Sequence, residues 1–381
     1  MENQHLTYFK VENFKKFDSL EVKDIGQFNL IVGDNNVGKT CFLEALLIIN
    51  STNINRSVEL LHYSLCSRKY HIHVKGINSK NPIIPNKNYF DYIKNNKSNK
   101  KIVFYWNDEN LSFEDVSLSE LNDSDFNNEK KHNYNVGRPE YWIKINDKQT
   151  YKELQFMYLD DFISKLDHGY LPLISMGAGF DRDINHFYAE TIGLQEGETL
   201  KISFDDSYDL IQSQIKELSL EEKNEFIDNM KLFFSDIQDI MIRSYEERDI
   251  LSIKLERHDD YLPLTYFGDG TNIFIRCLFE ILKNKGQKLL VDEFGEGIHY
   301  SKLEKFCKII MEVALKNNVQ LFATTHSEEC IKAFYEASKE LKLKEKIRLI
   351  SLEEGNNKIY SSTYNFDNIE AGLYSNIELR A

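Results

Sequence analysis

Apolar runs near the N-terminus predict three strands followed by one helix. The strands are expected at residues 6–12, 19–25 and 27–32, where β-branched and aromatic residues are bounded by turn-forming residues. The apolar run CFLEALLII follows Gly38 and predicts a buried helix ending near Asn50. The third strand and this helix therefore flank a loop that contains glycine.

The pattern changes in the middle of the chain. Residues 51–150 are rich in Asn, Lys, Ser and Asp, and their strand-like islands at 102–106 and 141–145 predict a β-rich insertion with polar loops. Residues 151–250 are expected to form a helical lobe, with a capping box from Ser219 to Glu222. Apolar residues then recur at helical spacing and predict one core-facing helix face: Phe226, Met230, Phe233, Ile237 and Ile240.

The C-terminal segment, residues 251–381, alternates between strand-like and helix-like patterns. Strands are expected at 251–256, 288–293 and 319–326, helices at 271–286 and 301–318, and a hairpin around Gly355–Asn356. This order predicts an α/β fold with a mostly parallel sheet covered by helices on both faces.

The loop after the third strand matches the phosphate-loop pattern GxxxxGK[ST] as Gly33-Asp34-Asn35-Asn36-Val37-Gly38-Lys39-Thr40. Lys39 is expected to reach the β- and γ-phosphates of ATP, and the Thr40 hydroxyl to bind Mg²⁺. The helix start adds N–H groups and a positive dipole end. A polar turn before a helix is the alternative, but the flanking strand and helix favour nucleotide binding. The residues assigned to the nucleotide here are Gly33, Asn35, Asn36, Val37, Gly38, Lys39, Thr40 and Cys41.

Two later strand ends carry groups that suit ATP hydrolysis. The strand KLLVDE ends in Asp292, which can hold Mg²⁺ with Thr40, and in Glu293, which is placed to activate water. A core strand ending in two solvated acids is the alternative. The next strand ends before His326, which can hydrogen-bond the γ-phosphate, or can be a structural histidine.

A glycine pair also precedes the helix at 271. Gly268, Asp269 and Gly270 can expose N–H groups at that helix start, as an anion site requires. The pattern is weak by itself, because a Gly-Asp-Gly turn is common in loops.

Net charge, cysteine content and the length of apolar runs limit the classes of protein to which the chain can belong. The net charge is −14, from 47 basic and 61 acidic residues, which argues against coating nucleic acid by bulk charge. The Lys-rich run at 94–101 leaves DNA open as a partner, although such runs are more often solvated loops. Five scattered cysteines, no apolar leader and no apolar run of 18 residues predict a cytoplasmic protein without a membrane span.

The order of these motifs resembles the ATPase heads of ABC-type proteins such as SMC and RecF. The chain is more closely similar to stand-alone AAA-annotated ATPases related to the overcoming-lysogenization-defect (OLD) nucleases. The similar segments are the start of the chain through FNLIVGDNNVGKTCFLEAL, and PLTYFGDGTNIFIRCLFEI, KLLVDEFGEGIHYSKLEKF and LFATTHSEECI. They cover residues 6–50 and 250–381.

The resemblance implies an ATPase head assembled from residues 1–50 and 251–381. Two heads would enclose two ATP molecules, with Gly268–Gly270 of one facing the phosphate loop of the other. Glu293 would act as the catalytic base, His326 as a switch and Lys39 as a phosphate-binding catalytic residue. Such a switch ATPase would control a separately encoded effector, such as a nuclease in anti-phage defence, because the residues after His326 are expected to form only a strand pair and a short helix rather than a fused Toprim nuclease domain.

Two other functions stay open. The first is a RecF-like repair or recombination ATPase that acts as an ATP-dependent DNA clamp. The second is a nucleotide-binding scaffold that does not hydrolyse ATP. Two departures from the family pattern also stand out: the signature is GDG rather than LSGGQ, and Gly295 occupies a place that is often acidic, with Glu296 after it.

Overall fold

The computed structural model describes ten stretches of the chain. They are residues 5–49, 94–96, 101–117, 141–147, 155–158, 200–202, 215, 218–245, 248–283 and 285–375. Most of the expected insertion at 51–150, and part of the expected helical lobe at 151–250, lie outside them. The division into an ATPase head, an insertion and a lobe therefore stays a prediction.

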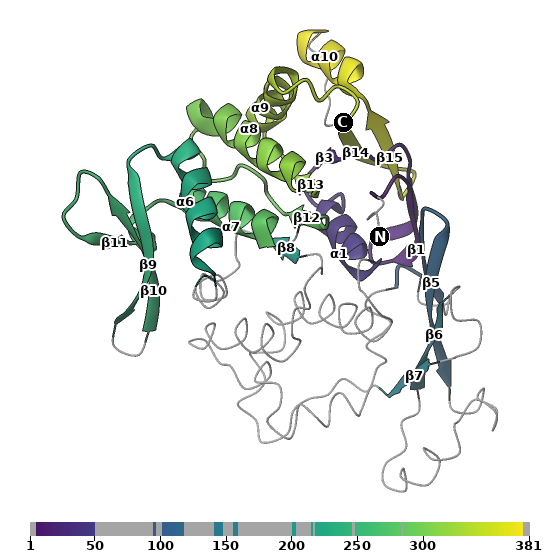
Figure 1. Cartoon of the computed structure of the whole chain (residues 1–381). Coiled ribbons are helices and arrows are strands. Elements are labelled where there is room, and N and C mark those ends of the chain that lie inside the picture. The colour runs from purple at the N-terminus through teal and green to yellow at the C-terminus, as the bar shows by residue number, and fades with distance from the viewer. Residues whose placement is uncertain are drawn as a thin grey trace, which may run out of the picture.

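A six-stranded sheet forms the centre of the molecule (Figure 1). Its strands run in the order β15-β14-β3-β13-β12-β8, and all neighbours are parallel except the antiparallel pair β14–β15. The strands are β3 (Phe28–Gly33), β8 (Leu200–Ile202), β12 (Lys288–Val291), β13 (Gln320–Thr324), β14 (Ile347–Gly355) and β15 (Lys358–Tyr364). The predicted mostly parallel α/β sheet and the C-terminal hairpin are confirmed.

This sheet separates two hydrophobic cores, and the alternation of side chains along β3 shows why. Phe28, Leu30 and Val32 point into a first core on one face of the sheet, whereas Ile31 points into a second core on the opposite face. Helices α6 (Leu220–Phe233), α7 (Asp269–Lys283), α8 (Tyr300–Lys316), α9 (Glu328–Glu340) and α10 (Phe366–Ser375) contribute to the first core, and α1 (Lys39–Ile49) to the second. Helices therefore cover both faces, as the sequence predicts.

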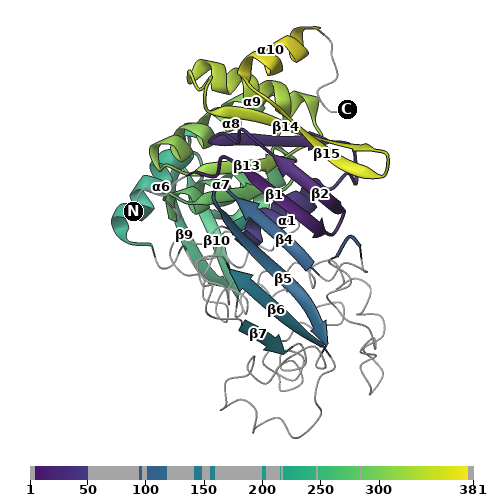
Figure 2. The ribbon, with the colours of Figure 1, turned by 90° about the vertical axis from the view of Figure 1, so that its right-hand side faces the viewer.

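A second six-stranded sheet is antiparallel and covers α1 from the other side (Figure 2). Its order is β2-β1-β4-β5-β6-β7. The strands are β1 (Phe9–Phe14), β2 (Phe17–Val22), β4 (Lys101–Trp106), β5 (Glu109–Ser117), β6 (Tyr141–Asp147) and β7 (Gln155–Tyr158). The pair Val11–Phe104 joins the N-terminal hairpin to the strands expected in the insertion, so those strands extend the N-terminal sheet.

The helix predicted to continue through Ile240 is wrong beyond Phe233. Ile237 and Ile240 belong to β9 (Ile237–Tyr245), which pairs with β10 (Arg248–Leu255). The register shifts at Lys254/Leu255, so Ile237 and Ile240 are both buried although they are three residues apart. This β-bulge reproduces the spacing of a helix face, which explains the error. A third strand, β11 (Tyr261–Pro263), and the short 3₁₀ helix η6 (Leu264–Tyr266) follow β10.

The start of α6 agrees with the predicted capping box. The Ser219 side chain accepts a hydrogen bond from the Glu222 N–H, and the Glu222 carboxylate accepts one of 2.8 Å from the Ser219 N–H. In the part of the chain that the structure describes, no helix is long and apolar enough to span a membrane.

We expect Ser219→Ala to lower the free energy of unfolding by about 1 kcal/mol, because it leaves the Glu222 N–H without its side-chain acceptor. Urea denaturation measures this loss. Ser219→Asp is the matched control, since aspartate also caps helices, and its stability should stay close to wild type. Equal stability of all three proteins would contradict a stabilising cap.

Candidate nucleotide-binding site

The phosphate loop connects β3 to α1, and two of its positions accept only glycine. Gly33 has φ of +143°, and a Cβ there would lie 2.4 Å from the Leu352 carbonyl oxygen of β14. Gly38 has φ of +120°, and a Cβ there would lie 3.1 Å from the Phe17 ring. The loop backbone therefore rests against both β14 and the β1–β2 hairpin.

Lys39 folds back over this loop. Its Nζ donates hydrogen bonds of 2.6 Å to the Gly33 carbonyl and 2.9 Å to the Asp34 carbonyl. Burial lowers the pKa of the Lys39 amine, while the nearby carboxylates of Asp292, Asp34 and Glu293 act in the opposite direction. The amine is thus held at the loop by groups that phosphate oxygens can replace.

Asp292 and Glu293 follow β12 and are tied to the neighbouring strand through Thr324. The Thr324 hydroxyl donates a 2.6 Å hydrogen bond to Asp292 Oδ1 and accepts a 2.9 Å bond from the Glu293 N–H. The Thr324 carbonyl accepts a 2.7 Å bond from the Phe294 N–H. Glu293 has φ of +58°, so these bonds hold a strained backbone, a feature that clusters at functional sites.

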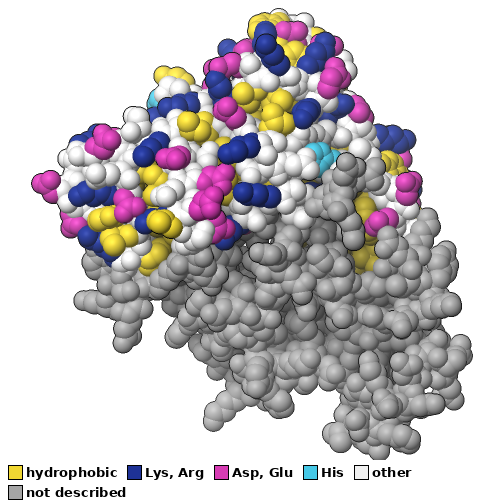
Figure 3. All heavy atoms as spheres, viewed as in Figure 1, with side chains coloured by type: hydrophobic (Ala, Val, Ile, Leu, Met, Phe, Trp, Pro, Cys, Tyr) yellow, Lys and Arg dark blue, Asp and Glu magenta, His cyan; other side chains and the backbone are white. Residues whose placement is uncertain are grey.

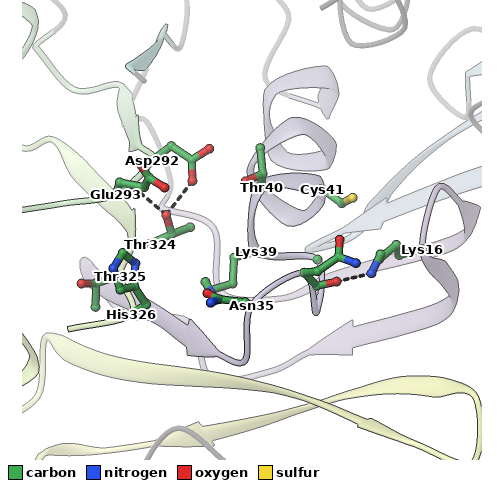
Figure 4. A pocket seen from close by; sticks show the side chains of 12 residues that line it. Lys16, Asn35, Lys39, Thr40, Cys41, Asp292, Glu293, Thr324, Thr325 and His326 are labelled. Carbon is green, nitrogen blue, oxygen red and sulfur yellow. Dashed lines mark hydrogen bonds between the residues drawn. The ribbon is translucent and has the colours of Figure 1, made fainter. Parts of the chain in front are cut away.

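These segments line one pocket with a volume of about 160 Å³ (Figure 4). That volume is below the roughly 300–1,000 Å³ of pockets that enclose whole drug-sized ligands, so it suits the phosphate end of a nucleotide. The residues that line it are Lys16, Asn35, Asn36, Gly38, Lys39, Thr40, Cys41, Asp292, Glu293, Thr324, Thr325 and His326. Nine of the residues predicted for the site are therefore together in this pocket.

Two predicted loop residues do not line the pocket. Val37 is buried in the second core, and Gly33 lies at the base of the loop, where Lys39 binds its carbonyl. Sequence reasoning also missed three lining residues, Lys16, Thr324 and Thr325. The Thr-Thr pair before His326 carried a signal, because hydroxyls at a strand end face the same edge as Asp292. Lys16 lies in a hairpin turn, and nothing in the sequence around it indicated a place in the pocket.

The Gly268–Gly270 segment lies outside the residues that line this pocket. Gly268 is exposed, and a Cβ there would meet no atom within 4 Å. Gly270 is different, because a Cβ there would lie 2.5 Å from the Gly297 carbonyl oxygen of the loop after Asp292. The start of α7 thus packs on the chain's own loop through Gly270 and leaves Gly268 open to solvent.

Gly295 lies in the same loop, at a position whose backbone favours glycine. Gly295 has φ of +84°, and a Cβ there would lie 2.9 Å from the Leu303 side chain and 3.2 Å from Cys330 Sγ. A side chain at this position would need both a left-handed backbone and space occupied by α8 and α9. Any side chain at position 295 would therefore be strained in this loop.

The oxygen ligands in the pocket suit Mg²⁺. Thr40 offers a hydroxyl and Asp292 a carboxylate, both hard donors that this cation prefers. Among the described residues, no three His, Cys, Asp or Glu side chains gather as a ready metal cluster. Phosphate oxygens and water would therefore have to complete the coordination, as is usual for Mg²⁺ at nucleotide sites.

A parallel sheet with a glycine-bounded loop before α1, and with acids at the end of a neighbouring strand, defines the class of P-loop α/β proteins. The chain belongs to the AAA ATPase domain family, whose model matches residues 5–331. It is therefore an ATPase. A Helicobacter pylori protein described as an ATP/GTP phosphatase is 22% identical over 378 residues, which cover 95% of this chain and 96% of that protein.

Solved structures of SMC heads are also similar to the chain. The SMC head domain from Thermotoga maritima is 12% identical with a TM-score of 0.45, covering 95% of this chain and 100% of that one. The Pyrococcus furiosus SMC head with an extended coiled coil, bound to the C-terminal domain of ScpA, is 8% identical with a TM-score of 0.45. That match covers 98% of this chain and 100% of the SMC chain.

We expect Thr324→Val to lower ATP turnover at least tenfold, because the Glu293 N–H loses its hydrogen-bond acceptor and Asp292 loses its donor. The part-buried N–H left without this partner should also lower the free energy of unfolding by about 1 kcal/mol. Steady-state phosphate release and urea denaturation measure the two effects. Thr324→Ser keeps the hydroxyl and serves as the control. Wild-type turnover in Thr324→Val would exclude a role for this contact.

Proposed function

We propose that this pocket hydrolyses Mg²⁺-bound ATP, and that ATP joins two copies of the chain while hydrolysis separates them. The observation that carries the proposal is the single pocket shared by the phosphate loop, Asp292, Glu293 and His326. The phosphate loop is more than 250 residues from Asp292, Glu293 and His326 in the sequence, yet together they offer a phosphate-binding loop, a Mg²⁺ ligand and a general base for ATP hydrolysis.

The residues have distinct roles in this reaction. Lys39 exchanges its loop carbonyls for β- and γ-phosphate oxygens, and loop N–H groups bind the rest of the triphosphate. Thr40 and Asp292 hold Mg²⁺, which offsets the charge on the β- and γ-phosphates. Glu293 orients the attacking water and accepts its proton, in the backbone geometry that Thr324 fixes.

We assign detection of the γ-phosphate to His326. It lies two residues after the end of β13, its side chain is exposed, and it lines the pocket on the same side as Glu293 (Figure 4). An imidazole N–H there can donate to a γ-phosphate oxygen, and it loses this partner once phosphate leaves. His326 would thereby distinguish ATP from ADP.

Gly268 supports the pairing of two copies. It is exposed at the start of α7, a helix of 15 residues, and it is outside its own chain's pocket. N–H groups at a helix start bind anions, so this surface suits the γ-phosphate held by a second copy. The pairing would bury two ATP molecules between the copies.

We extend the proposal to a separately encoded effector, such as a nuclease of anti-phage defence, that responds to the paired state. The support is the resemblance to stand-alone ATPases.

The alternative, a DNA clamp, receives less support from the described surface. Lys94, the first residue of the Lys-rich run, is only 5% exposed. On the face seen in Figure 3, basic and acidic side chains of the described residues are interspersed.

Two substitutions test the hydrolysis mechanism. Lys39→Ala should abolish ATP binding or turnover, because it removes the cation at the phosphate loop. Glu293→Gln should retain ATP binding but turn it over at least about a hundredfold more slowly, the scale expected for loss of a general base. Calorimetric titration and phosphate release separate the two effects. Normal turnover of Lys39→Ala would exclude the pocket as the active site.

The pairing of copies is tested by the solution mass of the Glu293→Gln protein with and without Mg-ATP. Light scattering should show a monomer that becomes a dimer with ATP. Adding Gly268→Leu should block the dimer and spare ATP binding, because the side chain projects into open space on its own chain. Gly270 is unsuitable for this test, since its substitution would disturb the packing on Gly297.

The matched control is Gly355→Leu in the β14–β15 hairpin, where a Cβ would meet only ordinary contacts at 3.7 Å. This variant should dimerise like the parent protein. If Gly268→Leu also dimerises normally, the start of α7 does not contact the second copy. If mass is unchanged by ATP in every variant, ATP does not drive pairing.

A further inference from the structure

The turn between β1 and β2 directs two consecutive lysines in different directions. Lys15 has φ of +50°, and its Nζ lies 2.8 Å from Glu44 Oε2 on α1, with both side chains less than 10% exposed. Lys16 is half-buried, and its Nζ donates a hydrogen bond to the Asn36 carbonyl of the phosphate loop. The Lys15–Glu44 pair therefore holds the turn against α1 and leaves Lys16 over the loop.

Packing fixes the turn in this place. Phe14 pairs with Phe17 across the hairpin, and both rings are fully buried in the second core. The Phe17 ring lies where a Cβ at Gly38 would be 3.1 Å away, so the hairpin and the loop are in direct contact. The position of Lys16 is thus set by buried groups on either side of it.

Lys16 lies at a defined end of the pocket. In the view of Figure 4, Lys39 lies between His326 and Lys16. Asp292 and Glu293 are on the His326 side, where the γ-phosphate is expected, and Cys41 is nearer to Lys16. Since a bound triphosphate would run along the loop from the γ end, Lys16 is at the end that ATP and ADP share.

We propose that Lys16 is a second phosphate-binding cation of this site, which contacts the α- and β-phosphates rather than the γ-phosphate. This inference rests on the proposed function, because it takes the pocket to bind a nucleotide. Its amine already binds one loop carbonyl, so a phosphate oxygen replaces that neutral acceptor with a charged one. Lys16 then stabilises bound ADP as much as bound ATP, and it sets the rate at which product leaves.

The test is calorimetric titration of Lys16→Ala with Mg-ADP and with the magnesium complex of a non-hydrolysable ATP analogue. Both dissociation constants should rise by on the order of tenfold, as expected for loss of one charge-assisted bond. Lys16→Arg should restore most of the affinity. Lys23→Ala is the matched control, because Lys23 follows β2, is 69% exposed and pairs with Glu21 outside the pocket.

The other possible results of this titration would contradict the proposed role of Lys16. Weaker binding of the ATP analogue with unchanged ADP affinity would mean that Lys16 meets the γ-phosphate, and would overturn the proposal. Unchanged affinity for both ligands would also overturn it, provided that the wild-type protein binds both ligands in the same assay. If Lys39→Ala keeps both wild-type affinity and wild-type turnover, the proposed nucleotide site itself fails, which is a distinguishable result.

Discussion

The structure depends on the parallel pairing of three buried strands, β3, β13 and β12. Most side chains of these strands are apolar and lie in one of the two cores. Pairings such as Val291–Ala323 and Thr324–Ile31 bring the three carboxyl ends to one edge. The polar groups of the site emerge at this edge, and the pocket forms there.

The central strand of these three, β13, lies next to both halves of the site. Because β13 lies between β3 and β12, Thr324 is next to both the strand that begins the phosphate loop and the strand that ends in Asp292. Its hydroxyl and carbonyl bind residues 292–294, and the next residue, Thr325, donates its N–H to the Ile31 carbonyl at 3.0 Å. One strand end thus couples the two halves of the site.

This coupling explains which parts of the site could be predicted from the sequence. The phosphate loop, Asp292 and Glu293 are local patterns, in which a strand, a turn and a charged residue are adjacent in the chain. The order of strands in the sheet is a long-range property, so the role of Thr324 and the approach of Lys16 could not be deduced. The spacing of apolar residues also did not distinguish a helix from a strand where a β-bulge placed Ile237 and Ile240 on one face.

The antiparallel sheet shows the same limit at a larger scale. Residues 101–117 looked separate from the N-terminus because a long polar stretch intervenes, yet β4 pairs directly with β1. Pairing across such a distance depends on which edges are free and which apolar faces match, and local propensity does not encode either. In this region the sequence pattern predicted only the strands near 102–106 and 141–145, and it missed β5 and β7.

The two lysines of the pocket also bear on how the loop can exist before it binds a nucleotide. Gly33 and Gly38 hold backbone conformations that other residues rarely adopt, and Asn36 has φ of +66°. The loop turns its carbonyls toward Lys39 and Lys16, whose amines bind Gly33, Asp34 and Asn36. In the proposed function a nucleotide would displace these bonds, so its affinity would reflect an exchange of acceptors rather than new bonds alone. The loop can therefore stay formed and selective for phosphate without holding the product too tightly for turnover.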